Sequence, residues 1–217
     1  MSLGYLRTPS RRYDDFPYIT FIIPSVGRPT LSRTIESLKN LNDPNWRAII
    51  VFDGIEPTFY SDDSRVSICA VQKQGYYNCA GAVRNQGIKL VTTRWVGFVD
   101  DDDVLLPNYI DAFRRQEVHH KPDVIIFRMQ TSERILPPHE HTDFYKGWVG
   151  ISFCAKTSLF QENNMWFEPS PWEDFWLLDK FRRSFKKIVM SPEITYIVRP
   201  TSDILPFQYN FLVAGQQ

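Results

Sequence analysis

Short, continuous apolar runs recur along this chain, separated by segments whose apolar residues fall three or four positions apart. Continuous runs rich in β-branched and aromatic residues are typical of strands that are buried on both faces. They predict strands at Tyr18 to Pro24, Ala48 to Phe52, Val66 to Val71, Trp95 to Val99 and Val124 to Met129, with shorter ones near Ile188 to Met190 and Ile194 to Val198.

The helical spacing between these runs predicts the helices of the fold. They are expected at Thr30 to about Leu41, Asn78 to Val91, Pro107 to about His119, and Pro171 or Trp172 to Phe185. Thr30 is placed to cap the first of them. In the second, the apolar residues available for the core are Ala82, Ile88 and Leu90.

Strands and helices that alternate in this way predict an α/β fold, with a mostly parallel central sheet and helices on both faces. The alternation ends near residue 130. Residues 131–147 contain Pro137 and Pro138 and are expected to form a long loop, which in a compact domain is usually functional or disordered.

The composition limits what the chain can do. Its 217 residues suffice for one domain, or for one domain with an appendage. Lys plus Arg and Asp plus Glu both number 25, so the chain lacks the basic excess expected of a nucleic-acid binder. The three cysteines show no metal-type spacing and are expected to be reduced, buried thiols. No apolar stretch reaches the ~20 residues of a membrane helix, and the polar start is unlike a secretory signal, so a soluble chain is expected.

A run of carboxylates, Asp100 to Asp103, follows the predicted strand that ends at Val99. Like charges in a row repel one another, and the C-terminal ends of strands are where α/β sheets bind ligands. Hard oxygen ligands suit Mg²⁺ or Mn²⁺, which often accompanies a phosphorylated ligand. The alternative is a solvated acidic turn, which the buried strand in front makes less favourable.

Two further acidic positions stand at predicted element ends. Asp53 follows the second strand and precedes Gly54, and Asp-Gly pairs are common in turns. Glu173 and Asp174 open a predicted helix, where acidic side chains interact favourably with the helix dipole. Taken alone, Asp53 is explained by a turn, and Glu173 and Asp174 are explained by the helix dipole. Because the ends of parallel strands meet at one edge, Asp53 and the carboxylate run are expected to converge.

Several short segments now stand in a recognisable order along the chain. They are Ile22 to Pro29, Ile50 to Gly54, Ala82 to Gly87, Val99 to Pro107, and Trp172 to Asp174. In that order and with those separations they resemble the GT-A glycosyltransferases, family 2 in particular. The resemblance implies a Rossmann-like GT-A catalytic domain over residues 18–200, with a nucleotide-sugar-binding half (18–129) and a smaller acceptor-side half (130–200). An N-terminal arm (1–17) and a C-terminal tail (201–217) would flank it.

The resemblance also implies roles at the nucleotide. Pro24 and Ser25 would lie against the nucleoside. Asp53 would accept a hydrogen bond from the base, as a carboxylate can from a uracil or thymine ring N–H. Arg84 would lie near the nucleotide, where its guanidinium suits phosphate or carbonyl oxygens.

For the reaction centre, the resemblance implies that Asp100 and Asp102 are the two ends of the family's Asp-x-Asp motif. Asp102 would be the direct metal ligand, and Asp100 a second ligand that faces the ribose or the donor sugar. Asp101 is the alternative in register and would contact the donor, whereas Asp103 is expected to cap the following helix. Asp174 would be the general base.

Other positions depart from the family or stay open. Phe52 stands where many relatives have Asp, so the nucleotide contacts are expected to differ. Arg199 occupies the region where some relatives supply a His metal ligand, and His139 and His141 could substitute unless they are solvated loop residues. Beside Asp174, Trp172 and Trp176 could stack on an acceptor sugar, with core packing as the alternative for Trp176.

The expected function is metal-dependent transfer, with Mn²⁺ or Mg²⁺, of a sugar from a nucleoside-diphosphate sugar to a hydroxyl group. A UDP-sugar is the favoured donor, inversion the expected stereochemistry, and a glycan, lipid-linked or protein hydroxyl the acceptor. The rivals are a sugar nucleotidyltransferase, whose Gly-rich phosphate loop is missing from Ser25 to Arg28, and a non-catalytic nucleotide-sugar-binding module. A cytoplasmic location is expected, with peripheral membrane association as the alternative.

Overall fold

The computed structural model describes residues 18–75 and 79–201, and the architecture below refers to these. The predicted arm, the start of the predicted helix at Asn78 and the tail beyond Thr201 lie outside them. The strands are β1 (Ile19–Ser25), β2 (Trp46–Asp53), β3 (Val66–Val71), β4 (Trp95–Phe98), β5 (Val104–Leu105), β6 (Val124–Gln130), β7 (Ile135–Leu136), β8 (Phe153–Lys156) and β9 (Ile188–Ile197). The helices are α1 (Leu31–Lys39), α2 (Gly81–Ile88), α3 (Tyr109–His120), α4 (Ser158–Gln161) and α5 (Glu173–Arg183).

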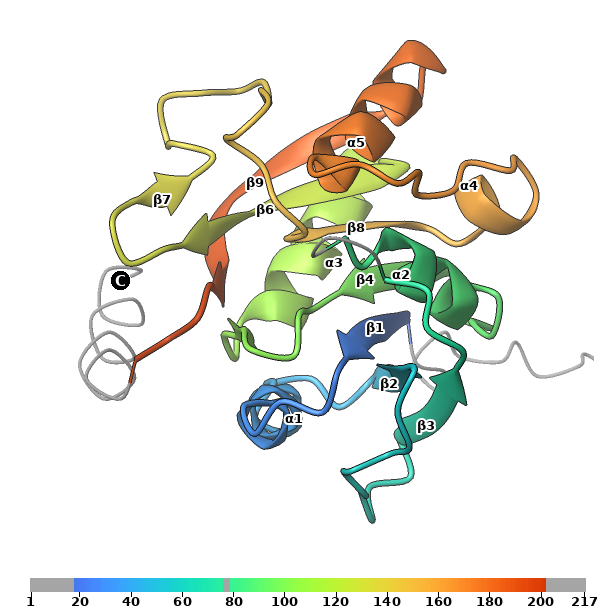
Figure 1. Cartoon of the computed structure of the whole chain (residues 1–217). Coiled ribbons are helices and arrows are strands. Elements are labelled where there is room, and N and C mark those ends of the chain that lie inside the picture. Colours follow the sequence, from blue (N-terminus) through green and yellow to red (C-terminus); the bar gives the residue numbers. More distant parts are fainter. Residues whose placement is uncertain (1–17, 76–78, 202–217) are drawn as a thin grey trace, which may run out of the picture.

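One sheet joins the strands in the order β3-β2-β1-β4-β8-β6-β9-β5, with β7 paired to β6 (Figure 1). The first part is parallel, because β2 and β4 both run alongside β1, and β3 runs alongside β2. All seven residues of β1 are buried, as its continuous apolar sequence requires of a strand covered on both faces. The C-terminal ends of β1, β2 and β4 therefore share one edge of the sheet.

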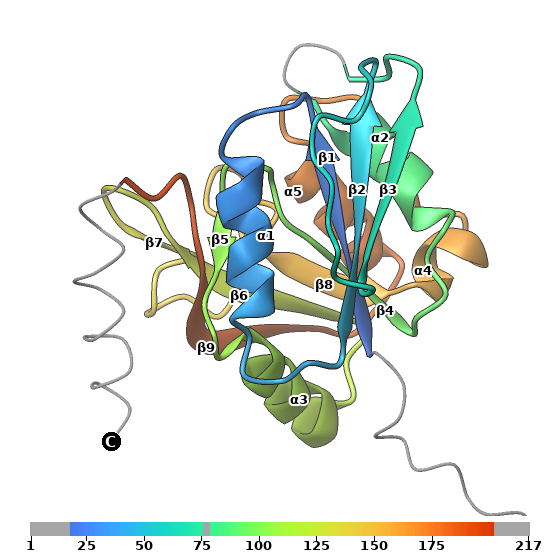
Figure 2. The ribbon, with the colours of Figure 1, turned by 90° about the horizontal axis from the view of Figure 1, so that it is seen from below.

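Aromatic contacts show which helix covers which face. Phe21 of β1 packs edge-on against Tyr109 of α3, with 5.2 Å between ring centroids. The next residue, Ile22, points to the other face, where α2 approaches so closely that a Cβ on Gly87 would lie 2.7 Å from it. On that same side Phe98 of β4 contacts Phe160 of α4. Figures 1 and 2 show α1 and α3 on one side of the sheet and α2, α4 and α5 on the other. The predicted α/β layering is confirmed.

Strand β8 was not predicted, and it lies in the middle of the sheet. It is antiparallel to both of its neighbours, β4 and β6. Its four residues form too short a run, after the polar Ser152, to stand out as a strand in the sequence. Because β8 comes from the region after residue 130, the sheet is continuous across both predicted halves.

The two short strands predicted near the end of the chain are one strand, β9, of ten residues. It is parallel to β6, with an irregular register in which Ile126 pairs with Met190 and Arg128 with Ile194. The extra residues on β9 include Pro192, and a bulge is a place where a sheet tolerates proline. Pro192 interrupts the apolar run in the sequence, but the strand continues through it.

Two details of the predicted helices are wrong. The Thr30 side chain does not cap α1, because its backbone is already helical (φ −67°, ψ −19°) and its hydroxyl is buried without a hydrogen-bond partner among the described residues. Leu90 is 55% exposed, since α2 ends at Ile88 and the chain turns before reaching it. Residues 131–147 form the predicted loop apart from the two residues of β7. Among the described residues, the helices are too short or too polar to cross a bilayer.

Candidate functional site

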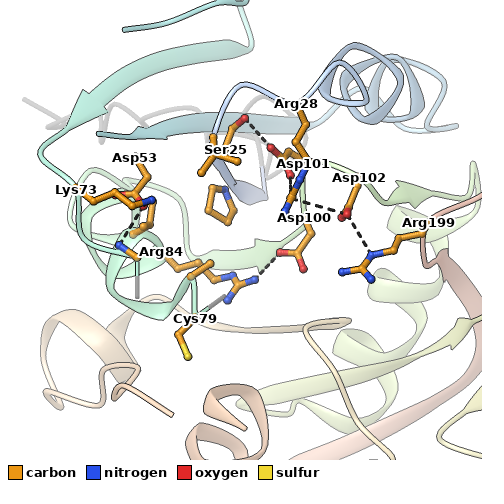
Figure 3. A pocket seen from close by; sticks show the side chains of 15 residues that line it. Ser25, Arg28, Asp53, Lys73, Cys79, Arg84, Asp100, Asp101, Asp102 and Arg199 are labelled. Carbon is orange, nitrogen blue, oxygen red and sulfur yellow. Dashed lines mark hydrogen bonds and ion pairs between the residues drawn. The ribbon is translucent and has the colours of Figure 1, made fainter. Parts of the chain in front are cut away.

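A cavity of about 780 Å³ opens at the carboxyl edge of β1, β2 and β4 (Figure 3). All seven residues predicted for the nucleotide and the metal line it, namely Pro24, Ser25, Asp53, Arg84, Asp100, Asp101 and Asp102. The topology explains this convergence, because each of these residues except Arg84 lies at or just beyond the end of a parallel strand. We call this the large cavity.

Ser25 and Asp101 join the ends of β1 and β4. The Ser25 hydroxyl donates to Asp101 Oδ2 at 2.7 Å, and Arg28 Nη1 donates to Asp101 Oδ1 at 2.5 Å. The Asp101 side chain is only 1% exposed. Both of its oxygens are therefore engaged in holding the β1 loop, which favours Asp102 over Asp101 in the alternative registers of the motif.

Asp53 organises the segment that follows β3. Its carboxylate accepts from Lys73 Nζ at 2.7 Å, from the Gln74 N–H at 2.5 Å and from the Gly75 N–H at 3.0 Å. Burial disfavours its charge, but these hydrogen bonds outweigh that effect and lower the pKa of Asp53. Gly54 supplies the turn after it with φ +74°, a conformation that favours glycine.

Arg84 is buried on α2 between two carboxylates. Its Nη1 donates to Glu173 Oε1 at 2.5 Å, and its Nη2 pairs with Asp100. Burial alone would lower the pKa of Arg84, but the charges of Asp100 and Glu173 raise it, so the guanidinium stays charged. Arg84 thus fixes the first carboxylate of the run.

Glu173 has a role that the sequence did not reveal. Instead of facing only the start of its own helix α5, it accepts from the Ala80 N–H at 3.0 Å and the Gly81 N–H at 2.8 Å, at the start of α2. A Cβ at position 81 would lie 2.6 Å from Glu173 Oε2, so this close approach requires glycine. Glu173 therefore connects the N-termini of α2 and α5.

Asp102 lines the large cavity and pairs with Arg199. Arg199 Nε donates to Asp102 Oδ2 at 3.1 Å, and Arg28 Nη1 lies 3.8 Å from the same oxygen. Behind the carboxylate, Arg33 Nη2 donates to the Asp102 carbonyl at 3.1 Å and Nη1 to the Pro200 carbonyl at 2.7 Å. Arg33 thereby holds the end of the carboxylate run against the segment after β9.

Asp103 does not cap the helix that follows, contrary to expectation. Its carboxylate accepts from the Tyr196 hydroxyl at 2.7 Å and from the Arg199 N–H at 2.8 Å, both from the far end of the chain. Burial and the neighbouring charge of Asp100 raise its pKa. Asp100, Asp102 and Asp103 each offer an oxygen, and these atoms lie within 4.8 Å of one another.

The two loop histidines do not belong to that group of carboxylates. The His141 ring packs against Trp148, with 4.4 Å between ring centroids. The carbonyls of His139 and His141 accept hydrogen bonds from Arg128. A metal role for the two histidines therefore stays a prediction, and the packing against Trp148 gives the His141 ring a structural role in the loop.

Asp174 lies in a second, smaller cavity of about 280 Å³, which shares Arg84 and Asp100 with the large one. Its Oδ1 accepts from the Phe175 N–H at 2.7 Å. Burial raises the pKa of Asp174 to about 6 from an ordinary value of 3.8. A carboxylate with such a pKa can exchange protons near neutral pH, as a general base must.

The surface beside Asp174 is aromatic. Trp172 and Trp176 are 41% and 44% exposed, so core packing of Trp176 is excluded. Lys146 Nζ lies 5.1 Å from the Trp172 ring centroid and 5.8 Å from that of Trp176. These three side chains form a surface where the loop of residues 131–147 meets the start of α5.

The sequence missed several residues that line the large cavity. They include Arg28, Lys73 and Cys79, while Arg199 was noted only as the residue in place of a His ligand. The signal of Arg28 and Lys73 is weak, because basic residues in loops are normally solvated, and only their pairing with carboxylates marks them. Cys79 had no signal in the sequence. The three cysteines, all among the described residues, form no disulfide, and only Cys154 is fully buried, whereas Cys69 and Cys79 are half-buried.

Known proteins resemble this chain in sequence. The sequence model of the family described as "Glycosyl transferase family 2" matches residues 20–171. The protein named "Putative glycosyltransferase EpsH" of Bacillus subtilis (strain 168) is 31% identical over 107 residues, which cover 46% of this chain and 30% of that protein.

Solved structures share the fold. TarS 1–349 of S. aureus in complex with UDP superposes with a TM-score of 0.68 at 15% identity, covering 91% of this chain and 64% of the other. The complex of TarS 1–349 with UDP-GlcNAc gives a TM-score of 0.65 at 16% identity, covering 85% and 59%. The chain thus spans less than two thirds of the length of these relatives. At this identity the likeness supports the GT-A fold alone.

Proposed function

We propose that this chain, which belongs to glycosyltransferase family 2, transfers a sugar from a nucleoside-diphosphate sugar to a hydroxyl acceptor. A UDP-sugar is the favoured donor. The observation that carries the proposal is the convergence of Asp53, Asp100 and Asp102 with Arg84 in one cavity at the carboxyl edge of the sheet. Such an edge is where α/β folds bind nucleotides.

The donor would occupy the large cavity, with the nucleoside near Pro24 and Ser25. The Asp53 carboxylate already accepts three hydrogen bonds, and oxygen atoms with two lone pairs each can accept a further one from a base N–H. Arg84, Arg28 and Arg199 bring positive charge to the region of the diphosphate.

A divalent cation fits the carboxylate run. Asp100, Asp102 and Asp103 supply oxygen atoms close enough to share one ion, and hard oxygen donors suit Mn²⁺ or Mg²⁺. We propose Asp102 and Asp100 as its ligands. When bound, such a cation supplies Lewis-acid stabilisation of the negative charge that develops on the leaving diphosphate.

The acceptor would enter the small cavity, where Asp174 would remove the proton from the attacking hydroxyl. A single base acting opposite the leaving group implies one displacement with inversion at the sugar. The exposed rings of Trp172 and Trp176, near the start of α5, offer stacking surfaces for the acceptor.

The test is a panel of nucleoside diphosphates and their sugars, offered with Mn²⁺ and followed by thermal unfolding and by release of the nucleoside diphosphate. A ligand at about 100 times its Kd should raise Tm by about 5–10 °C. Stabilisation together with sugar transfer or donor hydrolysis supports the proposal. Release of pyrophosphate from a nucleoside triphosphate and a sugar phosphate would indicate a nucleotidyltransferase instead, and stabilisation without turnover a binding module.

A further inference from the structure

Each carboxylate that lines the large cavity forms an ion pair with a basic side chain that also lines it. Figure 3 shows these pairs at close range. They are Asp53 with Lys73, Asp100 with Arg84, Asp101 with Arg28, and Asp102 with Arg199. The cavity is thus internally neutralised, although both a diphosphate and a divalent cation are proposed to bind there.

Of these pairs, the one between Asp102 and Arg199 is the most loosely held. Arg84 and Asp101 are 4% and 1% exposed and each has a second partner. Asp53 is fixed by two backbone N–H groups besides Lys73. The Arg199 side chain is 75% exposed, and its contact with Asp102, at 3.1 Å, is the longest of these ion pairs.

The backbone of Arg199, in contrast, is firmly placed. Its N–H donates to Asp103, and the next carbonyl accepts from Arg33. Its φ of +43° is in the left-handed region, which costs a non-glycine residue energy and is retained when surrounding contacts enforce it. The backbone of Arg199 is therefore fixed beside the large cavity, while its side chain is exposed and held by one ion pair.

We propose that Arg199 is the exchangeable cation of the donor site. It neutralises Asp102 in this structure and moves to the donor diphosphate when Asp102 takes a divalent cation. This inference rests on the proposed function. A nucleotide sugar carries its negative charge on the diphosphate and a divalent cation brings matching positive charge, so one exchange of partners keeps every carboxylate neutralised.

The exchange makes two opposite predictions for one side chain. In binding the cation alone, Arg199 is a competitor for Asp102, so its removal should strengthen binding. In binding the diphosphate, Arg199 is a partner through charge-assisted hydrogen bonds, so its removal should weaken binding. If Arg199 had a merely structural role, its removal would weaken the binding of both the cation and the diphosphate, or would change neither.

The experiment is titration calorimetry of Arg199→Gln with Mn²⁺ alone, and then with UDP in the presence of saturating Mn²⁺. We expect Mn²⁺ alone to bind about two- to fivefold more tightly, the size set by an exposed ion pair. UDP should bind about tenfold or more weakly, as expected from the loss of a charge-assisted hydrogen bond. If another nucleoside diphosphate of the panel stabilises the chain more, it replaces UDP.

Arg183→Gln is the matched control, because Arg183 is also 75% exposed and also pairs with an aspartate, on α5. It should leave both affinities unchanged. If Arg199→Gln does not fold, Arg199→Lys carries the test. Lysine can still neutralise Asp102 but lacks the forked donors, so only the UDP affinity should fall.

The outcomes separate the two hypotheses. If Arg199→Gln binds Mn²⁺ and UDP as tightly as the unaltered chain does, or binds both more weakly, the exchange is overturned. The proposed function is not affected by that result. If the unaltered chain binds no nucleoside diphosphate with Mn²⁺, the proposed function and the exchange both fail.

Discussion

At the scale of single residues, Asp174 occupies a place that disfavours its own charge. Its surroundings remove water, no cation among the described residues forms an ion pair with it, and burial raises its pKa to about 6. In the unfolded chain the value returns to about 3.8. The folded chain therefore binds this proton more tightly, so the group stabilises the fold below about pH 4 and loses that contribution as pH rises through 6.

Asp174→Asn should separate catalysis from stability. Transfer should fall about 10²- to 10⁴-fold because the base is lost, while donor binding stays near normal. The free energy of unfolding at pH 7 should rise by about 1–3 kcal/mol because a buried charge is removed. Activity assays and chemical denaturation measure the two effects. Glu168→Gln, at a side chain that is 71% exposed, is the control and should change neither. Normal turnover in Asp174→Asn would show that Asp174 is not the general base.

The same carboxylate should set the pH dependence of the rate. Only the ionised form accepts a proton, so kcat/KM should rise with pH and level off above about 6. A profile that is flat between pH 5 and pH 7, each about one unit from that value, would contradict the assignment.

Asp102 is the second residue whose proposed role, that of a metal ligand, can be tested by one substitution. Asp102→Ala should abolish the dependence of nucleotide binding on Mn²⁺, because it removes the carboxylate oxygens proposed as the direct ligands of the cation. Titration calorimetry of the nucleotide with and without Mn²⁺ measures this dependence. Asp62→Ala, at an exposed aspartate of the loop before β3, serves as the control. A variant at position 102 that still gained affinity from Mn²⁺ would exclude Asp102 as a ligand.

At the scale of elements, the site depends on how α2 and α5 meet. Glu173 at the start of α5 satisfies two N–H groups at the start of α2 and also binds Arg84. Helix starts leave N–H groups without partners, and here the partner comes from a residue about 90 positions away. The sequence shows both helices but not this connection.

Glu173→Ala should therefore destabilise the fold by about 2–4 kcal/mol, because two backbone N–H groups and Nη1 of the buried Arg84 lose their acceptor. Denaturant unfolding measures the loss. Glu168→Ala, which removes an exposed glutamate paired with Lys180, should cost less than about 1 kcal/mol. Equal losses in the two variants would show that Glu173 does not connect the helices.

The elements that could be predicted are those whose pattern is local. Strand β3 was predicted with its observed bounds, because its apolar run and its flanking turns are contiguous in the sequence. Strand β8 was missed, since a four-residue strand is defined by the neighbours it pairs with. For the same reason β9 was divided at Pro192, which a bulge accommodates.

At the scale of the whole molecule, the predicted halves 18–129 and 130–200 share one sheet. Strand β8 of the second half separates β4 and β6 of the first, and β9 pairs with β6. The large cavity likewise draws most of its residues from the first half and Arg199 from the second. Neither half can complete the sheet or the site alone.

Unfolding should therefore be a single cooperative transition. Trp46 and Trp95 are buried in the first half, whereas Trp172 and Trp176 report on the second. Tryptophan fluorescence and far-UV circular dichroism should give the same denaturation midpoint, with one transition by each probe. Two separated transitions would mean that the halves fold as independent units.

The sequence by itself determined the layered α/β fold, the family and the residues that converge at the carboxyl edge. The layering follows from local periodicity, and the convergence follows from the rule that parallel strands end together. The family follows from the resemblance carried by the order and separations of five short segments. Only the tertiary structure decided how each carboxylate is used. Asp101 is engaged by the β1 loop, Asp103 by Tyr196 and the backbone of Arg199, and Asp102 by an exposed arginine. Adjacent aspartates are chemically identical in sequence, and only partners brought from distant segments distinguish them.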